Sequence, residues 1–107
     1  MGCQYAWSWI CRKVYENALA HEMRKCGLRV VQQRGIVVHY DDMIVGENNA
    51  DLVVADQVIV ELKVVAALSD VYVPQCRNDL RATGKPVCLL INFGRAKIEI
   101  RRVTGQT

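Results

Sequence analysis

The sequence predicts an α/β fold in which helices flank a mixed central sheet. Three observations support this prediction. Apolar residues recur at helical spacing near the N-terminus, short runs rich in Val, Ile and Leu follow, and a second helical segment lies between two of those runs. With 107 residues the chain suits one compact domain and is too short for two, so residues 1–107 are predicted to form a single domain.

Two segments have the pattern of helices. Apolar residues recur at helical spacing over about 7–26, and Gly27 provides a stop. The second helix is predicted to run from residue 69 or 70, where Ser and Asp are suitable caps, to about residue 82, with Gly84 as its stop. Pro74 must then lie in its first turn, where proline is tolerated.

Six runs rich in β-branched and apolar residues are predicted to be strands. The most apolar of them are typical of central strands covered on both faces, whereas the last alternates as an exposed edge strand does. A polar stretch over 41–49 is predicted to be a connection. The six runs are residues 28–32, 36–40, 51–54, 58–64, 87–93 and 97–103.

Composition excludes other classes of protein. Hydrophobic residues make up 51% of the chain and charged residues 23%, which excludes an intrinsically disordered protein. No run of about 18 apolar residues occurs, so a membrane-spanning helix and a membrane partner are not expected. The five cysteines have the spacing of neither a zinc site nor a disulfide framework, which favours a reducing cytoplasm.

Three charged residues interrupt the most apolar pair of strands: Asp51, Glu61 and Lys63. A three-residue turn centred on Asp56 would place Asp51 opposite Glu61 in an antiparallel ladder, with Lys63 on the same face. Opposed Cβ atoms lie only about 5 Å apart. Two close, partly dehydrated carboxylates repel each other unless a cation lies between them, and Mg²⁺ or Mn²⁺ prefers such oxygen ligands. With a lysine beside a developing phosphate charge, the pattern indicates metal-assisted phosphodiester hydrolysis.

The same three residues have a plainer explanation. A set of Asp-Lys and Glu-Lys ion pairs across the end of two strands is common in sheets. The spacing by itself does not decide between such ion pairs and a metal site.

The segment 51–63, DLVVADQVIVELK, resembles the D…ExK core of the PD-(D/E)XK nuclease superfamily. More closely, the chain resembles the small bacterial GxxExxY proteins that are placed in that superfamily, and the resemblance covers most of its length. The matching stretches are VYENALAHEMRKCGLRV (14–30), VHYDDMIVGENNADLVVADQVIVELKVV (38–65) and ATGKPVCLLINFG (82–94).

The resemblance implies a restriction-endonuclease-like αβββαβ core and a nuclease that uses Mg²⁺ or Mn²⁺, with DNA favoured over RNA as substrate. It implies Asp51 and Glu61 as metal ligands, the backbone carbonyl of Leu62 as a further ligand, and Lys63 as the catalytic lysine. Gln75 matches the glutamine of a Q-x-x-x-Y helix motif from exonuclease-like branches of the superfamily, and it would lie near the metal.

The chain departs from the family pattern in its first helix and at the glutamine motif. Trp9 and Arg12 stand in place of the Gly and Glu of GxxExxY, leaving Tyr15, and Asp79 replaces the tyrosine of the glutamine motif. Family members usually carry residues ahead of this helix, which indicates a truncated, shifted or decaying reading frame here. These departures favour an alternative function, a module of the same fold that binds nucleic acid or protein without cutting. Apolar groups exposed at the shortened end, including Trp7 and Trp9, predict a homodimer.

A second glutamate can take the place of the one that is missing. On a helical wheel Glu22 falls within the apolar arc of the first helix, where a carboxylate needs either a metal or an internal hydrogen bond. Glu22 is therefore a further candidate metal ligand, with a structural hydrogen bond as the alternative. Glu16 falls on the rim of the arc and is expected to be solvated.

The positive charge of the chain is concentrated in its last third. The net charge is +3, and residues 77–107 contain seven of the 14 basic residues but only two acidic ones. Such a segment can follow a nucleic-acid backbone, although a solvated surface is the alternative. The candidate nucleic-acid-binding residues are Arg77, Arg81, Lys97, Arg101 and Arg102.

Overall fold

The computed structural model describes residues 8–105, with side chains from Ile10 onward. Trp7 and the side chain of Trp9, on which part of the dimer prediction rests, lie outside the described residues. The predicted order of helix, strands, helix and two final strands is confirmed. The elements are α1 (Ser8–Lys25), β1 (Val30–Tyr40), β2 (Met43–Val54), β3 (Val58–Lys63), a short 3-10 turn η2 (Asp70–Tyr72), α2 (Val73–Thr83), β4 (Val87–Asn92) and β5 (Glu99–Thr104).

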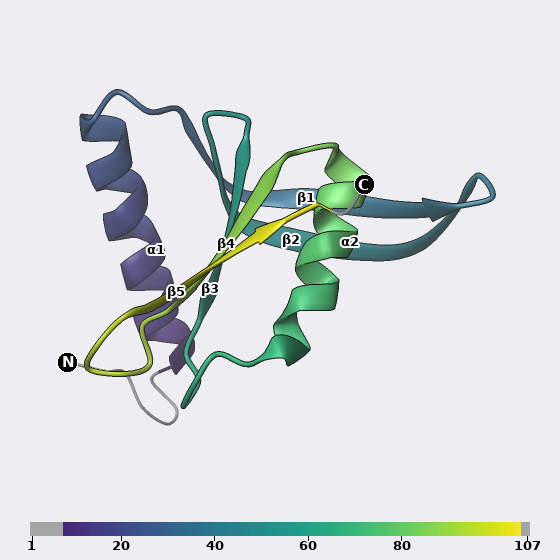
Figure 1. The fold of residues 1–107 in the computed structure, drawn as a ribbon. Helices are drawn as coiled ribbons and strands as arrows, with labels where there is room; N and C mark the ends of the chain where they lie inside the picture. Colours follow the sequence, from purple (N-terminus) through teal and green to yellow (C-terminus); the bar gives the residue numbers. More distant parts are fainter. Residues whose placement is uncertain (1–7, 106–107) are drawn as a thin grey trace.

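The strands of the described chain form one mixed sheet in the order β1-β2-β3-β4-β5. Residues 28–32 and 36–40, predicted as separate strands, join in the single strand β1. β3 and β4 are parallel because α2 crosses between them, and the other neighbours are antiparallel. The carboxyl ends of β3 and β4, at Lys63 and Asn92, therefore lie side by side at one end of the sheet (Figure 1).

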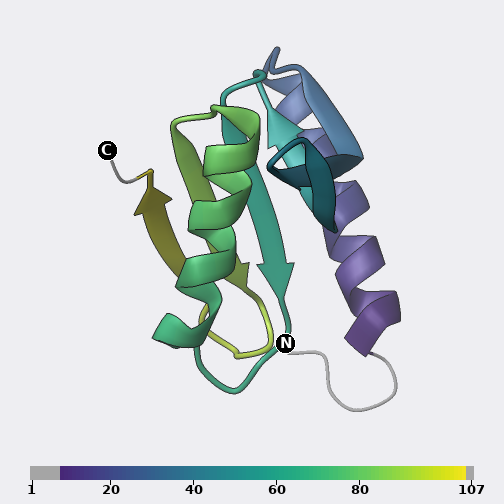
Figure 2. The ribbon, with the colours of Figure 1, turned by 90° about the vertical axis from the view of Figure 1, so that its right-hand side faces the viewer.

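The two helices cover opposite faces of the sheet (Figure 2). Val53 and Ile59 pack in the core beneath α2, and the residues that alternate with them pack beneath α1. Asp51, Glu61 and Lys63 share the alternation of Val53 and Ile59. Their positions therefore belong to the face that α2 covers.

The helix ends follow the predicted signals. Gly27 adopts a left-handed φ of 86°, and the next residue, Leu28, donates its N–H to the carbonyl of Met23 at 3.1 Å. This arrangement satisfies the last carbonyls of α1. Gly84 follows α2 with a left-handed φ of 71°, and its own N–H donates to the carbonyl of Leu80 at 2.8 Å. Neither helix of the described chain is long and apolar enough to cross a membrane.

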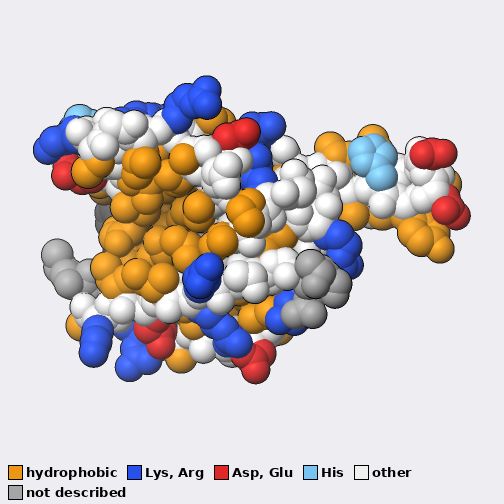
Figure 3. Space-filling view, turned by 45° about the horizontal axis from the view of Figure 1, so that its top comes forward, with side chains coloured by type: hydrophobic (Ala, Val, Ile, Leu, Met, Phe, Trp, Pro, Cys, Tyr) orange, Lys and Arg blue, Asp and Glu red, His pale blue; other side chains and the backbone are white. Residues whose placement is uncertain are grey.

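The prediction that residues 41–49 form a connection is wrong, because they belong to a long hairpin. β1 and β2 stay paired out to Tyr40 and Met43, and a two-residue turn joins them. Asp41 and Asp42, in this turn, have φ values of 51° and 62°, which tight hairpins require and which aspartate tolerates. The hairpin projects from the body as an arm (Figures 1 and 3). Because most of its side chains are exposed, the arm needs no apolar alternation that a sequence pattern would show.

β2 belongs to two parts of the fold. Its last residues pair with β3, whereas the residues before Leu52 pair only with β1 and lead into the arm. β2 and β3 therefore part at Asp51 and Glu61. A cleft opens at this point, and its lining includes Arg12 of α1 and Gln75 of α2.

Candidate active site

The predicted pair of carboxylates comes together where β2 and β3 part. The paired positions before the strands part are Leu52 with Val60, Val53 with Ile59, and Val54 with Val58. This register makes Asp51 and Glu61 the next opposed positions, as the length of the turn predicts. Both residues line a cleft of about 600 Å³, together with Leu62, Lys63 and Gln75. The structure thus brings together the five residues that the resemblance assigns to a nuclease site.

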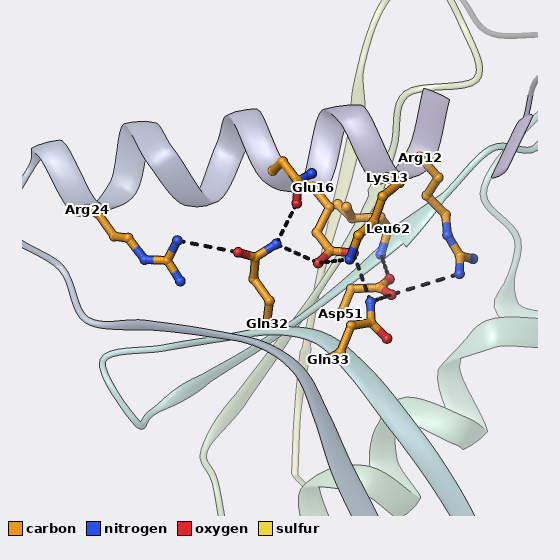
Figure 4. A network of polar contacts seen from close by, with 9 residues as sticks. Arg12, Lys13, Glu16, Arg24, Gln32, Gln33, Asp51 and Leu62 are labelled. Atoms are coloured by element: carbon orange, nitrogen blue, oxygen red, sulfur yellow. Dashed lines mark hydrogen bonds and ion pairs between the residues drawn. The ribbon is translucent and has the colours of Figure 1, made fainter. Parts of the chain in front are cut away.

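Asp51 is held by hydrogen bonds from two neighbouring strands. The backbone N–H of Leu62 donates to its Oδ2 at 2.7 Å, and Gln33 donates from Nε2 to its Oδ1 at 3.3 Å. Because β2 leaves β3 here, the Asp51 side chain supplies the acceptor that a longer ladder would otherwise offer to Leu62. Arg12 approaches from α1, with Nη2 at 4.0 Å from Oδ1 (Figure 4). The Asp51 carboxylate is therefore fixed in direction while its side chain is only 8% exposed.

Glu61 is buried next to two other acidic residues, Asp79 and Asp51. Burial, hydrogen bonding with Asp79 and the nearby Asp51 together raise the pKa of Glu61 to about 8. Burial also raises the pKa of Asp79, whose carboxylate accepts a hydrogen bond from Asn48 Nδ2 at 2.8 Å. Three acidic side chains thus share a region of low exposure. A bound cation would relieve their repulsion.

Asp51 and Glu61 supply the carboxylates that could hold a divalent ion. Within residues 10–105, no three His, Cys, Asp or Glu side chains are placed to share one ion. Mg²⁺, however, is commonly held by one or two carboxylates and keeps several waters. The donor set of this cleft therefore fits such an ion.

Lys63 and Arg12 are the basic residues among those that line the cleft. Lys63 Nζ lies 4.8 Å from the centroid of the Tyr72 ring, in a cation–π contact. The Arg12 side chain is 48% exposed, so it stands at the mouth of the cleft rather than inside the protein. The two cations therefore approach the carboxylates from different elements, β3 and α1.

The structure corrects the prediction for Glu22 and Glu16. The Glu22 side chain is 65% exposed and pairs with Lys25 at 3.5 Å, so it is not a candidate metal ligand. Glu16, expected to be solvated, is only 2% exposed. Its carboxylate accepts hydrogen bonds from Nε2 of Gln32 and of Gln33, each at 2.8 Å (Figure 4). Sequence reasoning therefore missed the carboxylate of α1 that lies behind the site.

The helical wheel predicts the wrong side of α1 to be buried. Glu16 and Ala20, one turn apart, form the buried side, whereas Val14 is 62% exposed. The apolar arc of this helix is broad, and the sheet covers only one edge of it. Gln33 connects Glu16 to the site, since its Nε2 contacts both Glu16 and Asp51.

Asp79 is a second residue that sequence reasoning did not assign to the site. It lies on α2 one turn after Gln75, is 2% exposed, and contacts Glu61. A signal was present, since Asp79 falls between Cys76 and Leu80, which the helical spacing predicts to be buried. A buried aspartate on that side of the helix requires a partner.

The structure does not gather the five basic candidates on one surface. Arg101 and Arg102 are consecutive in β5, so they lie on opposite faces of the sheet, and Arg101 pairs with Asp70. Arg81 lines a groove between α2 and the arm. Arg77 is half-buried on α2, and Lys97 lies in the connection between β4 and β5. Their role in binding nucleic acid stays a prediction.

Comparison with known proteins supports the predicted restriction-endonuclease-like fold. A family model for the PD-(D/E)XK nuclease superfamily matches residues 8–103. The crystal structure of an alkaline exonuclease (LHK-Exo) from Laribacter hongkongensis is similar, with a TM-score of 0.68 and 13% sequence identity, over 96% of this chain and 61% of that chain. This chain thus spans less than two thirds of that exonuclease. Comparison with curated proteins found no match.

Proposed function

Because the chain belongs to the PD-(D/E)XK nuclease superfamily, we propose that residues 1–107 form one domain that hydrolyses phosphodiester bonds in nucleic acid. The observation that carries this proposal is the cleft in which Asp51, Glu61 and Lys63 stand together. Metal-assisted phosphodiester hydrolysis can use all three groups, since carboxylates hold a divalent ion and an ammonium stabilises charge on the phosphate.

We further propose Mg²⁺ or Mn²⁺ as the cofactor. Asp51 and Glu61 would hold the ion, with the backbone carbonyl of Leu62 as a further ligand. The raised pKa of Glu61 supports this, because burial among other carboxylates leaves a deficit of positive charge at this point. When bound, such an ion polarises a phosphoryl oxygen and lowers the pKa of a bound water.

The side chains around the carboxylates would bind and orient the substrate. Lys63 offers its ammonium N–H groups to the negative charge that develops on the phosphate. Arg12, at the mouth of the cleft, would contact a phosphate of the incoming strand, since its guanidinium has only a long contact with Asp51. Gln75 would orient a water or a phosphate oxygen through its amide.

The finer features of the function follow as part of the proposal. The resemblance to GxxExxY proteins favours DNA over RNA, and Arg77, Arg81, Lys97, Arg101 and Arg102 would supply phosphate contacts. A cytoplasmic location is also part of the proposal, argued from the spacing of the cysteines in the sequence. An apolar groove of about 370 Å³ beside α1, with Val14 exposed, supports a homodimer.

One observation favours the alternative, a module that binds without cutting. The Arg12 guanidinium lies 4.0 Å from the carboxylate of Asp51, where a cation of the protein competes with a metal ion. A protein that has lost its metal would use the same basic groups to hold a phosphate backbone. The two functions therefore differ in metal binding and not in fold.

The test is cleavage of labelled single-stranded, duplex and branched DNA and RNA in Mg²⁺ or Mn²⁺. Wild type is compared with Glu61→Gln and Lys63→Ala, and Glu22→Gln and Lys25→Ala serve as matched controls because these two exposed residues pair with each other away from the cleft. We expect cutting to be lost in the first two variants and kept in the controls. Salt-dependent binding without cutting by folded wild type would instead support the binding module. Cutting retained in Glu61→Gln would show that the site lies elsewhere.

A further inference from the structure

The ammonium of Lys63 is held by an aromatic ring and not by a carboxylate. Its Nζ lies 4.8 Å from the centroid of the Tyr72 ring. Lys63 takes part in none of the ion pairs formed by the described residues. An aromatic face attracts a cation through its quadrupole and carries no net charge.

For a lysine that must act on phosphate, an aromatic ring and a carboxylate are not equivalent partners. A carboxylate would hold the ammonium in place, but it would cancel the positive charge and take up N–H donors. The Tyr72 ring holds Lys63 without either effect. Lys63 is among the residues that line the cleft, whereas Tyr72 is not.

We propose that Tyr72 is a positioning residue, whose ring aims the Lys63 ammonium into the cleft while leaving its charge and N–H groups available to a substrate phosphate. This inference rests on the proposed nuclease function. It assigns to Tyr72 a role in the rate of cutting, although Tyr72 itself touches neither substrate nor metal.

The local structure holds the Tyr72 ring in place. Tyr72 ends the short turn η2, at whose start Ser69 Oγ accepts a hydrogen bond from the Val71 N–H at 3.4 Å. α2 begins at the next residue, Val73, so the backbone of Tyr72 is continuous with a helix that packs on the sheet. Tyr72 and Leu68 also pack against the core beneath α2. The ring is therefore part of a rigid element and not of a free loop.

The residues that precede Tyr72 form hydrogen bonds with β4 and β5. Asn92, at the end of β4, bonds both backbone groups of Val65, accepting at 3.0 Å and donating at 2.9 Å. Glu99 Oε1 accepts from Leu68 N–H at 3.1 Å and from Asn92 Nδ2 at 2.9 Å. Gly94 completes this contact, because a Cβ there would lie 2.7 Å from the backbone nitrogen of Val65. These bonds fix the residues before Tyr72 without using any residue of the cleft.

Two substitutions separate the ring from the hydroxyl. Tyr72→Phe keeps the aromatic face, whereas Tyr72→Leu keeps an apolar side chain and removes the ring. Tyr40→Leu is the matched control, since Tyr40 is 69% exposed on the arm. Thermal unfolding of each variant shows whether it folds as wild type does.

The first readout is independent of activity. In protein labelled with 13C at the lysine ε carbons, the Lys63 signal, identified by its absence in Lys63→Arg, should show a ring-current shift in wild type. The shift should remain in Tyr72→Phe and disappear in Tyr72→Leu. A wild-type signal without a ring-current shift would overturn the proposal.

The second readout is the rate of cutting. In Tyr72→Leu we expect kcat to fall about 10²-fold with little change in KM, as for a misplaced catalytic group, and Tyr72→Phe to cut as wild type does. Lys63→Ala combined with Tyr72→Leu should be no slower than Lys63→Ala, because the ring acts through Lys63. A folded Tyr72→Leu that cuts at the wild-type rate would overturn the proposal, as would an equal loss in Tyr72→Phe. Failure of wild type to cut any substrate would instead overturn the nuclease function, and the positioning role with it, before any change at Tyr72 is made.

Discussion

The Oδ2 atom of Asp51 accepts a hydrogen bond from the backbone N–H of Leu62 at 2.7 Å, where β2 and β3 part. A side chain thus takes over the role of a backbone acceptor at the end of a ladder. The same bond fixes a carboxylate at the edge of the cleft. Asp51 therefore serves the stability of the sheet and the geometry of the proposed metal site together.

Replacing Asp51 should separate these two roles. Asp51→Asn retains an oxygen that can accept from Leu62, so we expect stability near that of wild type but no metal-dependent cutting. Asp51→Ala leaves the buried N–H of Leu62 unpaired, which should cost about 1–3 kcal/mol of unfolding free energy. Urea unfolding of the two variants tests this difference. Equal stability of Asp51→Asn and Asp51→Ala would contradict the structural role of the bond.

The pKa of Glu61 predicts how stability depends on pH in the absence of metal. This pKa is raised from 4.5 to about 8 on folding, so between these pH values the folded protein binds a proton that the unfolded chain does not. The stabilising effect of that proton is fully present below pH 4.5 and is lost as the pH rises through about 8. We expect the unfolding free energy to fall over this range and to level off above it.

Urea unfolding at a series of pH values tests this in wild type, Glu61→Gln and the exposed control Glu22→Gln. The slope should be reduced in Glu61→Gln, which cannot ionise, and unchanged in the control. A slope that is the same in all three proteins would mean that Glu61 is not the group responsible. Saturating Mn²⁺ should also reduce the slope in wild type, because the ion favours the charged carboxylate.

Two glutamates of α1, the buried Glu16 and the exposed Glu22, should differ strongly in their contribution to the free energy of unfolding. Glu16→Ala removes the carboxylate that accepts from the Nε2 groups of Gln32 and Gln33, and loss of these two charge-assisted bonds should cost about 1.5–3 kcal/mol. Glu22→Ala removes only an exposed pair and should change stability by less than about 0.5 kcal/mol. Chemical denaturation measures both. Similar effects in the two variants would contradict the orientation of α1.

We expect Arg12 to weaken the binding of a metal ion and to strengthen the binding of a phosphate backbone. Arg12→Ala removes the cation beside Asp51, so Mn²⁺ should bind the substrate-free protein about two- to fivefold more tightly, the range for a partly exposed ion pair. An oligonucleotide should bind more weakly. Titration followed by electron paramagnetic resonance of Mn²⁺ measures the first effect and fluorescence anisotropy the second. Unchanged Mn²⁺ binding in Arg12→Ala, relative to Lys25→Ala, would remove Arg12 from the site.

Several features of this protein could be predicted from local sequence. The turn between residues 54 and 58 sets the register of β2 and β3, and the two-residue repeat of a strand then decides which side chains share a face. The sequence therefore predicts that Asp51, Glu61 and Lys63 lie close together. The helix stops at Gly27 and Gly84 were equally local, since a left-handed residue is needed at such a position.

Other features depend on contacts between elements that are distant in sequence. The burial of Glu16 instead of Glu22 depends on which edge of a broad apolar arc meets the sheet. The approach of Asp79 to Glu61 depends on how α2 lies across the strands. The strand character of residues 43–49 comes from their pairing with β1. An exposed hairpin needs no apolar pattern in its sequence.

The sequence by itself thus determined the order of elements, the register of the central hairpin and the identity of its acidic and basic residues. These follow from turn length, strand alternation and capping, which act over a few residues. Only the tertiary structure decided which groups surround those residues: Arg12 at Asp51, Asp79 at Glu61 and the Tyr72 ring at Lys63. The physical reason is that burial and electrostatic contact depend on how helices dock on a sheet, and docking is set by the packing of the whole core.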